Sequence, residues 1–135
     1  MAAKNVDAHE VNDRVCLIAS DCFNALADKQ YDLILSNPPY VHPDEMHDLP
    51  KEYTHEPELA LVADDEGLAI VMRILKEASC FLKPEGLLVI ETGYSDETLM
   101  ARFKEAPWVW LDTDADCSGL LCVTKESLEE FWRGQ

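Results

Sequence analysis

The residues best suited to chemistry form the tetrapeptide Asn37-Pro38-Pro39-Tyr40. Each proline fixes φ and lacks an N–H, so the backbone here is stiff and rich in carbonyl acceptors. The Asn37 side-chain oxygen and the Pro38 carbonyl can each accept one hydrogen from the same planar NH2 group. The Tyr40 ring can stack on the flat group that these two acceptors hold. The tetrapeptide therefore predicts a site that turns an amide or amine nitrogen toward an electrophile.

A short apolar strand must position this tetrapeptide. The run Leu33-Ile34-Leu35 predicts a strand covered on both faces, and the two prolines end the sheet after it. In an open parallel sheet, ligands bind at the carboxyl ends of the strands. A simpler alternative is an Asn-Pro turn that only ends a strand. The apolar strand before the tetrapeptide and Tyr40 at its end favour the functional interpretation.

The rest of the chain predicts an α/β fold in which strands and helices alternate. A buried strand is expected at 15–18, followed by Asp21, and a doubly buried strand at 87–91. Thr92-Gly93, at the end of that second strand, is expected to line the same cleft. The other expected elements are a helix capped by Asp64 or Asp65 and ending near 82, a helix from Ser95 to about 103, an antiparallel hairpin of 108–113 with 119–124, and a helix at 125–132 capped by Thr124.

Charge and composition narrow the class of partner. The chain of 135 residues has 27 acidic and 11 basic residues and a formal charge of −16. Such a surface repels phosphate backbones, which argues against a direct nucleic acid partner. It would attract a basic protein, although the acidity could equally serve only to keep the protein soluble. The cysteines are scattered without CxxC pairs, and no signal peptide or membrane-spanning run is present. These features predict a cytoplasmic protein with reduced thiols and no membrane partner.

A long polar segment, 42–64, follows the tetrapeptide and is expected to form the rim of a substrate pocket. It contains His42, His47 and His55 beside several acidic residues. Their spacing fits no common metal-ligand pattern, so we expect solvated histidines and no metal.

The tetrapeptide and its flanks resemble the S-adenosylmethionine-dependent methyltransferases that modify the side-chain amide nitrogen of glutamine. The segment DLPKEYTHEPELAL at 48–61 and the ending GLLCVTK at 119–125 are most similar to the branch that acts on a ribosomal protein of the L3 type. The resemblance covers nearly the whole chain. It corresponds to only the later part of the family's catalytic domain.

The resemblance implies a role for each matching residue. Asn37, Pro38 and Tyr40 would be catalytic, and Pro39 would join them in holding the substrate amide. Asp21 would contact the adenine amino group of S-adenosylmethionine, with Asn37 also near the cofactor. The alternative for Asp21 is that it only caps the short turn through Phe23 and Leu26. No metal is implied. The implied partner is a basic, L3-like ribosomal protein.

The resemblance also implies a partial Rossmann-like sheet. The family's seven strands lie in the order three-two-one-four-five-seven-six and end in an antiparallel hairpin. Residues 1–135 would form the C-terminal portion of one catalytic domain, without the first two strands, the glycine-rich cofactor loop or the helical N-terminal domain. We therefore expect the fragment alone to be inactive and the strand before Asn37 to have an open edge, through which a homodimer could form.

Three other functions remain open. The chain could belong to a release-factor glutamine methyltransferase, since the tetrapeptide does not separate the two branches. It could belong to a nucleobase amino-methyltransferase, which shares the tetrapeptide but would need a basic groove. It could also be an inert fragment that binds partners through its open sheet edge.

Overall fold

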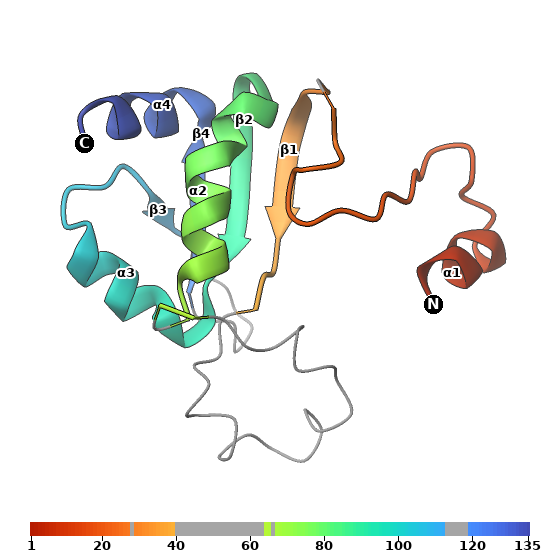
Figure 1. The fold of residues 1–135 in the computed structure, drawn as a ribbon, viewed down its shortest axis with the longest axis horizontal. Helices are drawn as coiled ribbons and strands as arrows, with labels where there is room; N and C mark the ends of the chain where they lie inside the picture. Colours follow the sequence, from red (N-terminus) through yellow and green to blue (C-terminus); the bar gives the residue numbers. More distant parts are fainter. Residues whose placement is uncertain (28, 40–63, 66, 113–118) are drawn as a thin grey trace, which may run out of the picture.

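The computed structural model describes residues 1–27, 29–39, 64–65, 67–112 and 119–135 (Figure 1). Helices and strands alternate along the described chain, as expected for an α/β protein. The elements are α1 (Ala2–Ala8), β1 (Tyr31–Ser36), α2 (Ala69–Phe81), β2 (Leu82–Glu91), the 3-10 helix η4 (Gly93–Ser95), α3 (Asp96–Arg102), β3 (Val109–Trp110), β4 (Leu120–Thr124) and α4 (Lys125–Arg133). None of the described helices is both long enough and apolar enough to cross a membrane.

The four described strands form one mixed sheet in the order β1-β2-β4-β3. β1 and β2 are parallel, with Ser36 beside Ile90, while β4 pairs antiparallel with both β2 and β3. The expected closing hairpin is therefore confirmed. Because parallel neighbours cannot be joined by a tight turn, the chain must cross over between β1 and β2, and α2 is part of that crossover.

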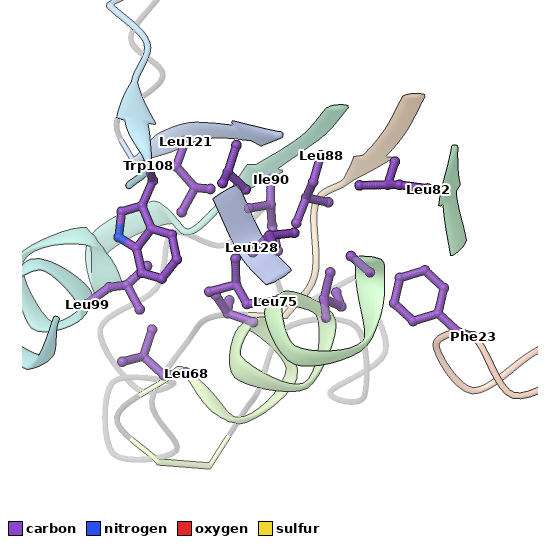
Figure 2. Close-up of a cluster of buried hydrophobic side chains, with 14 residues drawn as sticks. Phe23, Leu68, Leu75, Leu82, Leu88, Ile90, Leu99, Trp108, Leu121 and Leu128 are labelled. Atoms are coloured by element: carbon purple, nitrogen blue, oxygen red, sulfur yellow. The ribbon is translucent and has the colours of Figure 1, made fainter. Parts of the chain in front are cut away.

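The hydrophobic core lies between one face of the sheet and helices α2 and α4 (Figures 1 and 2). Side chains alternate along a strand, so every second residue of β2 and β4 points to this face. The buried strand residues there are Leu88, Ile90, Leu121 and Val123; the helices contribute Val71, Ile74, Leu75, Ala78 and Leu128. The Trp132 indole N–H donates to the Leu75 carbonyl over 2.9 Å and ties α4 to α2.

The opposite face of the sheet is largely open to solvent. The strand register aligns Leu35, Val89, Cys122 and Val109 in one row across all four strands. Leu35 is 69% exposed and Val109 is 61% exposed. We call these four residues the apolar row. The expectation that the strands at 31–36 and 87–91 are covered on both faces is wrong for the outer face, because the described helices bury their side chains against the inner one.

The strand expected at 15–18 does not form, and that prediction is wrong. Val15, Leu17 and Ile18 are 41%, 50% and 42% exposed. A strand requires a neighbour for its backbone hydrogen bonds, and in the described chain this segment has none. Helix α1 buries no residue, and it projects away from the sheet with the segment that follows it (Figure 1). We call residues 1–20 the N-terminal arm.

The helix caps were predicted with mixed success. Thr124 caps α4, since its side-chain oxygen accepts a hydrogen bond from the Ser127 N–H, as expected. Helix α2 begins only at Ala69, after Leu68, so neither Asp64 nor Asp65 caps it with a side chain. The Asp65 carboxylate instead pairs with Arg102 on α3, with N–O distances of 2.7 and 3.0 Å, and this ion pair lowers the pKa of Asp65. That ion pair could not be found from local spacing.

Candidate functional site

The candidate site lies where β1 and β2 end side by side. Because Ser36 pairs with Ile90, the residues after them, Asn37 and Glu91, follow at the same edge of the sheet. Asn37 is exposed, whereas Pro38 is buried and Pro39 is half-buried. The buried proline anchors the backbone beside Asn37, and the exposed amide oxygen is an acceptor that groups in solvent can reach. Tyr40, like the segment with the three histidines, lies outside the described residues.

The carboxyl end of β2 is held by two hydrogen bonds to one atom. The carbonyl oxygen of Gly119, just before β4, accepts from the Thr92 N–H over 2.7 Å and from the Thr92 hydroxyl over 2.9 Å. Thr92 is fully buried, so neither bond competes with water. Thr92 is thus a structural residue that fixes the edge of the sheet beside Asn37. The prediction that Thr92-Gly93 lines the cleft stays a prediction.

Asp21 lies against α2, where its carboxylate pairs with Arg73. One terminal nitrogen of Arg73 lies 2.8 Å from each carboxylate oxygen, and the other donates to the Asp21 carbonyl over 3.3 Å. Asn24 adds a bond of 3.2 Å to the same carboxylate. Hydrogen bonding to Asp21 raises the pKa of Arg73 above its ordinary value. No hydrogen bond or ion pair joins Asp21 to Asn37 among the described residues: Asp21 is paired with Arg73 on α2, whereas Asn37 follows β1.

Arg73 is a residue that sequence reasoning missed. Its partner lies 52 residues earlier in the chain, so no local spacing indicates the pair. A second contact reinforces the first, since the Phe23 ring stacks on Phe81 with centroids 4.7 Å apart. Together the two contacts fix residues 21–23 on α2. In the sequence, only the charge of Asp21 and the aromatic ring of Phe23 indicated that residues 21–23 have partners elsewhere in the fold.

Cys22 shares this environment but offers no nucleophile. Partial burial raises the pKa of its thiol, and the nearby Arg73 charge opposes that rise only in part. A raised pKa keeps the sulfur protonated and weakly reactive near neutral pH.

A shallow pocket lies away from these residues, at the ends of α3 and α4. It has a volume of about 420 Å³ and is lined by Phe103, Phe131 and neighbouring residues of both helices. Arg102 also lines it, but its guanidinium is paired with Asp65. The pocket therefore has no contact with β1 and adds nothing to the candidate site.

Comparison with known proteins links this site to methyl transfer. A family model described as a methyltransferase small domain matches residues 1–56, which include Asp21 and the tetrapeptide. The chain is 38% identical over 131 residues to the ribosomal protein uL3 glutamine methyltransferase of Francisella tularensis, covering 97% of this chain and 42% of the relative.

Two further relatives carry the same description. The uL3 glutamine methyltransferase of Neisseria meningitidis serogroup A is 41% identical over 128 residues, covering 95% of this chain and 42% of the relative. That of Xanthomonas campestris is 44% identical over 111 residues, covering 82% and 36%. The chain thus spans about two fifths of the length of the curated relatives it matches. It is homologous over most of its length to a part of the ribosomal protein uL3 glutamine methyltransferases, and the resemblance drawn from its motifs is confirmed.

Proposed function

We propose that this chain forms part of a cytoplasmic enzyme that methylates a glutamine side chain in a basic ribosomal protein of the uL3 type. One observation carries the proposal: Asn37 is exposed at the carboxyl end of a parallel strand, next to a buried proline. The similarity to uL3 glutamine methyltransferases supports the choice of substrate.

The chemistry follows from the acceptors. An amide nitrogen is a poor nucleophile because its lone pair is delocalised. The rate acceleration must therefore come from orientation and electrostatics. The Asn37 oxygen and the Pro38 carbonyl each accept one hydrogen of the glutamine NH2, and Tyr40 stacks on its plane. These residues would hold the nitrogen toward the methyl group of S-adenosylmethionine; the new N–CH3 bond would replace the S–CH3 bond, S-adenosylhomocysteine would leave, and the cationic nitrogen would lose its proton to water. No metal takes part.

The residues present fit S-adenosylmethionine, which supplies an electrophilic methyl group when bound. The Asp21 Oδ2 accepts from both Arg73 and Asn24, whereas Oδ1 accepts from Arg73 and has a second lone pair for another donor; the side chain is 67% exposed. A carboxylate of this kind can accept from the adenine amino group. Asn37 lies at the sheet edge where it can serve both cofactor and substrate.

The strand order supports a place in a larger sheet. The order β1-β2-β4-β3 equals the four-five-seven-six part of the seven-stranded order that the resemblance implies. On this basis, 1–135 is the C-terminal portion of one catalytic domain. The first two strands, the glycine-rich loop and the helical domain would come from chain upstream.

Calorimetric titration with S-adenosylmethionine tests the proposal first. We expect binding by a chain extended upstream to the length of the relatives and none by residues 1–135. In the extended chain, Asn37→Ala should lower kcat on a uL3-type protein by about a hundredfold or more, as loss of an oriented acceptor does elsewhere. Asn12→Ala, a change in the N-terminal arm, is the matched control and should leave kcat unchanged. Equal activity in both variants would exclude the proposed role of Asn37.

The substrate is tested in the same assay. Transfer of labelled methyl to a uL3-type protein should exceed transfer to a release factor, and DNA should accept none. Preferred labelling of the release factor would assign the chain to that branch, and labelling of DNA would assign it to the nucleobase enzymes.

A second candidate function is partner binding through the sheet edge. β1 is the last strand on its side of the described sheet, and Leu33 and Leu35 on it are 48% and 69% exposed. An exposed apolar edge strand recruits another strand. A homodimer through β1 is the simplest such complex, and it requires no methyl transfer.

A further inference from the structure

The ion pair between Asp21 and Arg73 joins a residue that the proposed function uses to one that it does not. The Arg73 side chain on α2 is 28% exposed, and that of Asp21 is 67% exposed. An ion pair so open to solvent adds little to the stability of a fold. The contacts that Arg73 makes are therefore better explained by a role in the site than by stability alone.

Arg73 holds Asp21 at both its side chain and its backbone. The Arg73 Nη1 donates to both carboxylate oxygens over 2.8 Å, and Nη2 donates to the Asp21 carbonyl over 3.3 Å. The guanidinium is itself held one turn further along α2, where Nε donates to Glu77 over 3.3 Å. Because a guanidinium is planar and its donors are fixed relative to one another, these contacts fix the direction of the carboxylate.

The same contacts leave the Asp21 carboxylate with one acceptor for a further donor. Oδ2 accepts from Asn24 over 3.2 Å as well as from Arg73, which uses both of its lone pairs. Among the described residues, Oδ1 accepts only from Arg73 and keeps its second lone pair. A single acceptor in a fixed direction favours a base that presents an amino hydrogen there. A base with a carbonyl oxygen at the same place would meet a carboxylate with which it cannot pair.

We propose that Arg73 is a positioning residue that acts through Asp21 and makes the cofactor site selective for adenine over a base without an amino group. The inference rests on the proposed function, in which Asp21 accepts from the adenine amino group. Without Arg73, an exposed aspartate would have to be ordered each time the cofactor binds, and this ordering costs affinity. Arg73 removes that cost because it orders the carboxylate in advance.

Calorimetric titration with two probes tests the proposal, in the chain extended upstream so that the rest of the domain is present around the pair. The probes are S-adenosylhomocysteine and S-inosylhomocysteine, which has a carbonyl oxygen in place of the amino group. The wild type should prefer the first by about tenfold or more, as expected for one hydrogen bond to a charged group. Arg73→Ala should remove most of this preference although Asp21 is unchanged, and Asp21→Ala should remove all of it.

Three further variants separate positioning from a merely structural role. Arg73→Lys keeps the charge but has all its donors on one atom, so it should recover only part of the preference; full recovery would overturn the positioning role. The double variant Asp21→Ala/Arg73→Ala should lose no more preference than Asp21→Ala, because Arg73 acts only through Asp21. Lys83→Ala breaks a 2.8 Å ion pair with Asp32 at the amino end of β1; it is the matched control and should keep the full preference.

The outcomes separate this inference from the proposed function. In methyl transfer, Arg73→Ala should raise KM for S-adenosylmethionine about tenfold and leave kcat unchanged, because the ribose separates the adenine from the sulfonium. If Arg73→Ala keeps the wild-type preference between the probes, whatever its Tm, the inference is wrong and the proposed function stands. A wild-type extended chain that binds neither probe would overturn the proposed function and the inference with it.

Discussion

Replacement of Gly119 by alanine should be among the most destabilising single changes in this chain. Gly119 has a φ of +71°, where an alanine costs about 1–2 kcal/mol. Its added Cβ would lie 2.4 Å from the Gly93 carbonyl oxygen and 2.7 Å from the Thr92 hydroxyl oxygen. Relief of that clash separates Gly119 from Thr92 and weakens two buried hydrogen bonds, each worth about 1 kcal/mol.

The expected loss is therefore about 3–4 kcal/mol, a large part of the stability of a typical domain. In a chain of this size it lowers Tm by about 10 °C or more. Urea unfolding and calorimetry measure both values. Gly134→Ala is the matched control, because its Cβ would lie 3.5 Å from the nearest atom, and it should be neutral. A Gly119→Ala variant that melts within 2 °C of the wild type would refute the reasoning.

Two other changes test the caps and ion pairs. Thr124→Ala removes the cap of α4 and should lower the free energy of unfolding in urea by about 1 kcal/mol. Thr124→Ser keeps the capping oxygen and should lower it little. Equal losses of stability in the two variants would show that the cap is unimportant. A hydrogen bond from Lys83 holds the pKa of Asp32 below its ordinary value. The pair therefore stabilises the folded state fully at pH values above the pKa of an unfolded aspartate, about 3.9. This stabilisation is lost as the pH falls through the lower pKa of the folded state. Asp32→Asn should thus flatten the fall of Tm in acid relative to Asp13→Asn, and identical acid profiles would contradict the assignment.

Local signals in the sequence predicted the elements that depend on local contacts. The prolines after β1 placed its end correctly, and Thr124 was identified as a cap because a cap needs only the next three residues. The hairpin of β3 and β4 followed from two apolar runs separated by a polar turn.

Other features were not predicted correctly, because they depend on partners far away in the sequence. Residues 15–18 and 33–35 have similar composition, yet only the second becomes a strand, since β2 is there to pair with it. The Asp21–Arg73 ion pair joins residues far apart in the chain, and no spacing rule indicates it. In the candidate site, Asn37 and Pro38 were predicted from residue type, and their roles stay a prediction, whereas the bonds from Thr92 to Gly119 required the fold.

The apolar row on the outer face of the sheet has a thermodynamic consequence. Leu35 and Val109 keep most of their surface in water in the folded chain, so unfolding exposes less new apolar area than usual. Apolar exposure sets the heat capacity change of unfolding, which is about 1.6–2 kcal/mol/K for an ordinary domain of this length. A smaller value makes the curve of free energy against temperature flatter. The monomer should therefore lose stability on cooling more slowly than a domain whose sheet is covered on both faces.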